Sequence, residues 1–169
     1  MSDDRDARFI DDFKPARLLA RDADDLAVLS ALLQDAVALS GELAWLPKQK
    51  RFAFVANRYR WEAPEAEERV RVGAHFDQVT RARVLGLDPT LKDRPVTILA
   101  LSFEARAGGG EEDPGGLLRI ACAPDALTGK PIEIALEVEA IEAALSDMTR
   151  PWAAKSRPAH QPPDDLDPL

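Results

Sequence analysis

The residue types that carry out most enzymatic chemistry are scarce in this chain. Its 169 residues include one cysteine and two histidines. His75 and Asp77 stand two positions apart in a strand-like segment, where such residues are mere neighbours on one face. Cys122 shares a strand face with Leu118 and Ile120, which indicates a small buried hydrophobe. One cysteine and one histidine outside the C-terminal tail do not make a zinc site. The sequence therefore predicts no catalytic residues, no metal and no cofactor.

Two short motifs have the composition of phosphate-binding loops without their context. Thr128-Gly129-Lys130 lacks the upstream glycine and the strand-to-helix setting, which predicts a hairpin turn. Gly108–Gly110 lacks dinucleotide spacing, which predicts a plain surface loop. Glu137, Glu139 and Glu142, near the last strand, are expected to face solvent. An enzyme whose carboxylates are brought together only by the fold stays open as an alternative.

A block of basic residues is the most distinctive feature of the chain. Positions 48–60 contain no acid, and their cations are Lys48, Lys50, Arg51, Arg58 and Arg60. Alternation in a strand over 51–61 divides its side chains between two faces. Phe52, Phe54, Arg58 and Arg60 share one face, and Ala53, Val55, Tyr59 and Trp61 share the other.

Pairing of this strand with a second strand over 69–76 decides which face is buried. A register with Tyr59 opposite Val70 gathers one apolar set for the core: Val55, Tyr59, Trp61, Val70, Val72, Ala74 and Phe76. It also places Arg58 and Arg60 opposite Arg71 and Arg69. Because like charges across a strand pair are destabilising, we expect carboxylates, solvent or an anionic partner to offset them. The candidate binding residues are therefore Arg58, Arg60, Arg69, Arg71, His75, Phe52, Phe54, Lys48 and Lys50.

This arginine-rich sheet face supports three interpretations. The leading one is a non-catalytic interaction module that binds an unidentified protein partner. The second is binding of RNA or another polyanion through the same face. The net charge of −8 disfavours nucleic acid, although the segment 48–83 is locally basic. The third, which is the simplest explanation of an exposed run of charges, is a solvated face that Glu62, Glu67 and Glu68 neutralise. The sequence leaves the oligomeric state open.

Periodicity predicts the elements that position these residues. A helix is expected over 23–39, capped by Asp22 and ended by Gly41. Strands are expected near 16–20, 42–46, 51–61, 69–76, 79–86, 96–103, 117–122 and 132–138. Ile141, Ala144, Leu145 and Met148 have helical spacing, which predicts a C-terminal helix.

This order predicts an α+β domain with a curved, mostly antiparallel sheet of six to eight strands. Short connections force antiparallel pairing, and one N-terminal and one C-terminal helix would cover a roll or barrel similar to a pleckstrin-homology domain. Residues 1–14 are expected to be a flexible arm, 15–150 a single domain and 151–169 a mostly disordered Pro/Asp-rich tail. No apolar run is long enough to span a membrane, and no signal region follows the polar N-terminus. A cytoplasmic location is expected.

Several stretches together resemble a known family. They are Asp24–Ser30 with Leu33–Ala36, Trp45–Lys48, Arg51–Ala53, Asn57-Arg58, Trp61, Glu137–Ile141 and Leu145–Asp147. The chain resembles, from about residue 16 to 160, an uncharacterised family of small alphaproteobacterial proteins, a domain of unknown function. The resemblance implies a bacterial cytoplasmic setting and supplies no catalytic residues.

Overall fold

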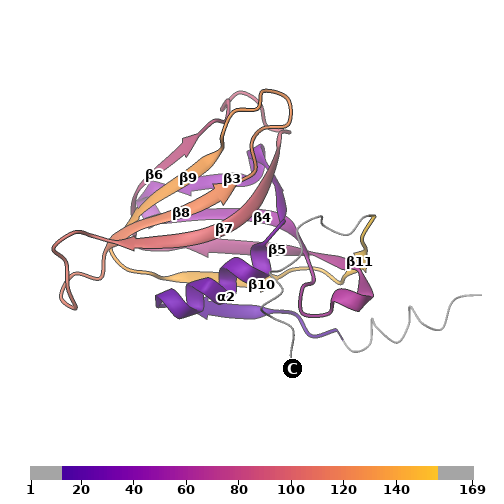
Figure 1. Ribbon diagram of the computed structural model, residues 1–169, viewed down its shortest axis with the longest axis horizontal. Helices are drawn as coiled ribbons and strands as arrows, with labels where there is room; N and C mark the ends of the chain where they lie inside the picture. Colours follow the sequence, from indigo (N-terminus) through magenta and orange to yellow (C-terminus); the bar gives the residue numbers. More distant parts are fainter. Residues whose placement is uncertain (1–12, 156–169) are drawn as a thin grey trace, which may run out of the picture.

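The computed structural model describes residues 13–155, which form one sheet of eleven strands with a single α-helix (Figure 1). The elements are β1 (Arg17–Ala20), α2 (Ala23–Leu33), β2 (Val37–Leu39), β3 (Leu43–Leu46), β4 (Arg51–Tyr59), β5 (Glu68–Phe76), β6 (Val79–Leu85), β7 (Pro95–Ala105), β8 (Gly116–Cys122), β9 (Glu133–Val138), β10 (Ala143–Asp147) and β11 (Trp152–Ala153). The predicted mostly antiparallel sheet is confirmed. Most of the expected arm (residues 1–12) and tail (156–169) lies outside the described residues, but β11 falls in the part of the tail that is described.

The strands form an open, curved sheet in the order β1-β10-β5-β4-β2-β7-β8-β9-β6. Strand β4 lies at its centre: one edge pairs with β5, while β3 and β2 divide the other edge between them. Strands β1 and β6 are the two end strands, so the sheet does not close into a barrel. Figure 1 shows its two halves curling toward each other, with loops 86–94 and 123–131 at the upper end.

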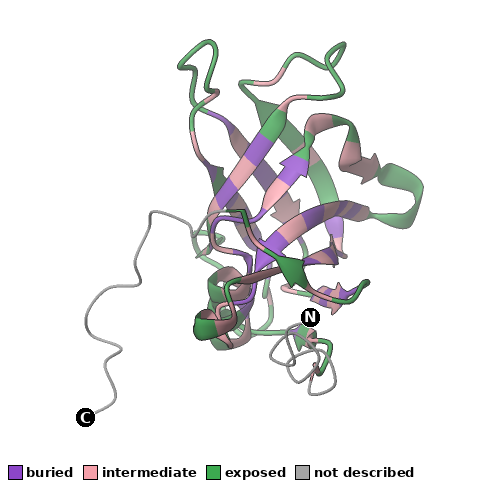
Figure 2. Ribbon diagram, turned by 90° about the vertical axis from the view of Figure 1, so that its right-hand side faces the viewer, coloured by how far each residue is buried: buried purple, intermediate pink, exposed green. Residues whose placement is uncertain are grey.

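The concave side of this sheet contains the hydrophobic core. Alternate residues of each strand point inward, and the buried set includes Phe52, Phe54, Val72, Ala74 and Phe76. Leucines of α2 join the same cluster, because the helix packs against β7 and β1. Figure 2 shows buried segments along the strands and exposed loops at the upper end.

The helix is shorter than its sequence pattern predicts. Asp22 caps it by accepting a hydrogen bond from the backbone N–H of Asp25 at 2.8 Å, and Leu26, Leu29 and Leu33 are buried. It ends at Leu33 because the chain reverses through Asp35, whose φ of 61° is left-handed. The predicted helix over 23–39 is therefore wrong beyond Leu33, and residues 37–39 form β2 instead.

The predicted C-terminal helix is wrong. Residues 143–147 form β10, which lies between β1 and β5. Ala143, Leu145 and Asp147 are buried, while Ala144 and Ser146 point to the other side. Together with the short strands β2 and β11, β10 brings the number of strands to eleven, above the expected six to eight. The comparison with pleckstrin-homology domains depended on a C-terminal helix, which these residues do not form.

The register of β4 and β5 also differs from the predicted one. Arg58, not Tyr59, lies opposite Val70, and Tyr59 lies opposite Arg69. The inward set of β4 is consequently Phe52, Phe54, Ala56 and Arg58. Arginines do not face arginines across this strand pair, and the expected repulsion does not arise.

Candidate functional site

Arg58, a candidate for the binding face, lies inside the protein. Its side chain is fully buried and donates to both carboxylate oxygens of Asp147, from Nε at 2.9 Å and from Nη2 at 2.8 Å. It also donates to Glu62, from Nη2 at 2.7 Å. Burial alone would lower the pKa of Arg58, but the bonds with Glu62 and Asp147 outweigh it and raise the pKa. Arg58 is therefore a structural cation, and Phe52 and Phe54 beside it are core residues.

Most of the remaining basic candidates pair with acids or carbonyl groups. Buried Arg60 pairs with Glu68. Arg69 donates to the carbonyl oxygens of Asp35 and Asn57, and burial lowers its pKa. The candidates therefore do not form one continuous basic face.

Arg71, His75 and Lys50 are more exposed, and each has an acidic neighbour. Arg71 pairs with Glu42. His75 Nδ1 lies 3.2 Å from Asp77, although the geometry is not that of a hydrogen bond. Lys50 Nζ lies 3.3 Å from Glu139. Lys48 is exposed in the 3-10 turn η2 (Pro47–Gln49).

A broad sheet face with small side chains lies on the side of β4, β5 and β10 that points away from the core. We call it the outer face and define it by the outward residues of these strands and their exposed apolar neighbours: Ala53, Val55, Gly73, His75, Ala144, Ser146, Leu19 and Met148. The side chain of Met148 lies across Gly73, where an added Cβ would be 3.2 Å from Sδ. Ion pairs bound the face, Arg51 with Asp77 at one end and Arg71 with Glu42 at the other.

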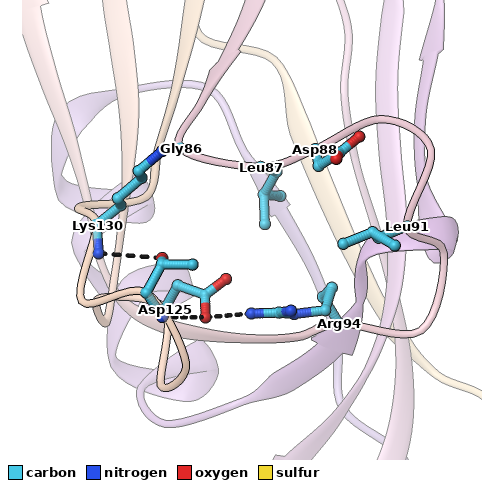
Figure 3. A pocket seen from close by; sticks show the side chains of 8 residues that line it. Gly86, Leu87, Asp88, Leu91, Arg94, Asp125 and Lys130 are labelled. Atoms are coloured by element: carbon cyan, nitrogen blue, oxygen red, sulfur yellow. Dashed lines mark hydrogen bonds and ion pairs between the residues drawn. The ribbon is translucent and has the colours of Figure 1, made fainter.

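A pair of cavities lies between loops 86–94 and 123–131, at the upper end of the sheet. The first, of about 420 Å³, is lined by Gly86, Leu87, Asp88, Leu91, Arg94, Asp125, Thr128 and Lys130. Figure 3 shows the Arg94 guanidinium reaching toward Asp125, with Leu87 and Leu91 beside it. The second, of about 570 Å³, shares Leu91, Arg94 and Asp125 and is otherwise lined by Asp93, Pro95, Thr97, Ala123, Pro124, Ala126 and Leu127. The Arg94–Asp125 ion pair therefore stands between two adjoining cavities.

The loops hold this ion pair through several hydrogen bonds. Ser40 Oγ accepts from the backbone N–H of Arg94 at 3.1 Å and donates to the carbonyl of Leu91 at 2.7 Å. Asp125 Oδ1 accepts from the backbone N–H groups of Leu127 and Thr128 as well as from Arg94. The Leu127 N–H bond, with smaller contributions from Thr128 and Arg94, lowers the pKa of Asp125 and keeps it ionised.

The chemistry that these groups offer is charge pairing. The carboxyl groups with a clear pKa shift in the described part of the chain all have a lowered pKa, so none stands out there as a general acid. Cys122 is buried in the core, as expected, and burial raises the pKa of its thiol to about 12. Residues 13–155 contain no cluster of three or more potential metal ligands, and no helix among them is long and apolar enough to cross a membrane.

A family model described as protein of unknown function DUF2948 matches residues 16–160, most of the chain. The chain belongs to the DUF2948 family. This membership confirms the resemblance to an uncharacterised domain. No curated protein and no solved structure matches the chain, so the arguments about this DUF2948 protein rest on its own residues.

The sequence reasoning missed Arg94 and Asp125 although it recognised both of their loops. Prolines and aspartates marked 87–94 and 124–130 as turns, and Thr128-Gly129-Lys130 is indeed part of the β8–β9 hairpin turn, closed by a bond from the N–H of Asp125 to the carbonyl of Lys130 at 2.9 Å. Binding residues are often found in loops. The sequence shows an arginine in one of these turns and an aspartate in the other. Because 31 residues separate them, it does not show that they form a pair.

Proposed function

We propose that this DUF2948 protein is a non-catalytic interaction module that binds a partner protein through the outer face, in the cytoplasm of an alphaproteobacterium. The observation that carries the proposal is that, among the described residues, this face consists mostly of small or apolar side chains and carries two exposed ones. Leu19 is 65% exposed and Met148 is 61% exposed. The one α-helix among residues 13–155 packs on the opposite side of the sheet. Larger exposed apolar patches mark protein-binding sites, and a partner that covers Leu19 and Met148 would remove this apolar surface from water.

The shape and charge of the face suit a second sheet or a flat protein surface. Ala53, Gly73, Ala144 and Ser146 have short side chains, and sheets pack face to face at a distance of roughly 10 Å. Arg51 and Arg71 at the margin already have acidic partners, which reduces the charge that could attract a polyanion and leaves exposed Arg17 of β1 as a cation beside the face. RNA binding is therefore the weaker alternative, because it would require unpaired Lys and Arg side chains.

A charge placed in the centre of the face tests the proposal. Ser146→Arg adds a long cation at an outward position of β10, while Ala100→Arg adds the same side chain at an exposed position of β7 as a matched control. In affinity capture with cross-linking from cells of the source organism, we expect wild type and Ala100→Arg to retain one partner that cross-links to the outer face. Ser146→Arg should lose it.

Two results would contradict the proposal: a partner that Ser146→Arg retains in full, or cross-links confined to other surfaces. The RNA alternative is tested separately by fluorescence anisotropy. Strong binding that weakens steeply with added salt and disappears in Arg71→Glu would favour RNA over a protein partner.

A further inference from the structure

The two cavities beside the Arg94–Asp125 ion pair have a size suitable for a small metabolite. Their volumes of about 420 and 570 Å³ fall within the range of roughly 300–1,000 Å³ that is common for ligand pockets. They use different residues from the outer face, and they lie where two loops meet above the rigid strands β6 to β9. Such loops, held by a sheet, often form binding sites.

Both partners of the ion pair keep binding capacity for a ligand. Among the described residues, the Arg94 guanidinium uses only Nη2, in its bond to Asp125. Nε and Nη1 have no hydrogen-bond partner there, and neither atom is buried. In Asp125, Oδ1 accepts the hydrogen bonds from Arg94, Leu127 and Thr128, and Oδ2 has no partner among the described residues and is not buried. A cationic donor and an anionic acceptor are therefore accessible side by side.

Three other charged side chains line the cavities: Asp88, Asp93 and Lys130. Asp88 lies on the far rim in Figure 3. Its Oδ1 is occupied by Thr90, whose hydroxyl and backbone N–H donate to it at 2.6 and 2.9 Å. Lys130 lines the first cavity on the side opposite Arg94, and its side chain runs toward Gly86 in Figure 3. The lining of the two cavities thus holds two cations and three carboxylates, and Arg94 and Asp125 are the pair that lie side by side.

The second cavity adds an apolar compartment next to these charges. Its lining includes Pro95, Ala123, Pro124, Ala126 and Leu127. Leu127 is 80% exposed and Leu91 is 41% exposed. A ligand with an aliphatic group would cover these leucines and remove apolar surface from water.

We propose that the two cavities form a binding site for a zwitterionic α-amino acid with an apolar side chain. The α-carboxylate accepts from Arg94 Nη1, and Lys130 lines the same cavity. The α-ammonium group donates to Asp125 Oδ2. The aliphatic side chain occupies the compartment bounded by Leu91 and Leu127. A ligand with neighbouring opposite charges matches an arginine and an aspartate that already lie side by side.

Binding of L-leucine to the full chain, measured by calorimetry and by amide chemical shifts, tests this assignment. Three probes each lack one feature: 4-methylpentanoate has no ammonium group, leucinamide has no carboxylate and glycine has no side chain. We expect each to bind about tenfold more weakly than leucine or worse, because each leaves one part of the site without its partner. Leucine should shift the amides of Leu91, Leu127 and Gly129.

Variants locate the site on the protein. Arg94→Gln and Asp125→Asn should abolish leucine binding; the asparagine keeps an oxygen for the Leu127 and Thr128 amides. Leu127→Ser, at an exposed position where folding is not at risk, should weaken it. Arg119→Gln, which removes another arginine with two acidic neighbours, should leave it unchanged. Ser146→Arg should also leave it unchanged, because the outer face is not involved.

Three outcomes would overturn the proposal. Equal affinity for 4-methylpentanoate would identify a simple carboxylate site, and equal affinity for leucinamide would identify a cation site. Absence of binding by folded wild type at millimolar leucine would show that these cavities do not serve free amino acids.

Discussion

At the scale of single residues, the interaction that matters most for the fold is the buried pair of Arg58 and Asp147. Both side chains are fully buried, and two parallel hydrogen bonds join them. Asp147 also accepts from the backbone N–H of Ala16 at 2.8 Å. The pair therefore connects β4, β10 and the chain just before β1, which are far apart in sequence. An unpaired charge at this depth would be costly.

Replacing Arg58 with Met should therefore destabilise the protein strongly, because Asp147 would stay buried without its partner. We expect a loss of about 3–5 kcal/mol in the free energy of unfolding in urea. The double variant Arg58→Met/Asp147→Leu should recover part of this loss, since it removes both charges. Arg119→Met, at a solvent-exposed ion pair, is the control and should change stability by about 1 kcal/mol or less. Equal losses for Arg58→Met and Arg119→Met would show that the buried ion pair contributes no more to stability than an exposed one.

At the scale of elements, this one ion pair explains two errors of the sequence prediction. In β4 the inward positions read Phe52, Phe54, Ala56, Arg58, and in β10 they read Ala143, Leu145, Asp147. In each strand the last inward position carries a charge, which interrupts the apolar alternation. Its partner lies 89 residues away, so the local sequence does not indicate that the charge is paired and buried. The apolar pattern alone therefore favours a shifted register for β4 and a helix in place of β10. The other strands expected from the sequence agree with the structure to within a few residues.

The turn after β6 supplies a second test at this scale. Gly86 has φ of 85°, and a Cβ there would lie 2.0 Å from the carbonyl oxygen of Pro131. Gly108 has φ of 77°, but a Cβ there would meet nothing within 4 Å. Gly108→Ala should cost about 1–2 kcal/mol from its left-handed backbone alone. Gly86→Ala should cost about 1–3 kcal/mol more, because the loop must also move. Urea denaturation of both variants measures the difference, and similar losses would contradict the close approach of these two loops.

At the scale of the whole molecule, the two proposed binding regions differ in how far the sequence could reveal them. The basic block 48–60 was visible, but its prominence was misleading because the fold uses Arg58 and Arg60 internally. The outer face consists largely of small residues with no chemical signature, so only the strand order brings them together. The Arg94–Asp125 pair likewise arises where two loops meet. Sequence periodicity reports which residues alternate, whereas sites of this kind depend on which strands and loops become neighbours.

Ion pairs that link distant strands should also make the stability of the whole molecule sensitive to acid. Burial alone would raise the pKa of Glu42, but hydrogen bonds from the Leu39 amide and Arg71 outweigh burial and lower the pKa below 4.5. Hydrogen bonds from Arg58 lower the pKa of Glu62 in the same way. A carboxyl with a lowered folded pKa stabilises the protein above its unfolded pKa, and this contribution disappears as the pH falls through the folded pKa. The free energy of unfolding should therefore stay nearly level above about pH 4.5 and decrease below it.

Glu42→Gln should lower stability at neutral pH by about 0.5–1 kcal/mol and make the acid decrease shallower. Glu111→Gln, in the exposed β7–β8 loop, is the control. Denaturant titrations from neutral pH down through the acid range measure both, and an acid decrease of the same steepness in Glu42→Gln and wild type would exclude Glu42 as a contributor.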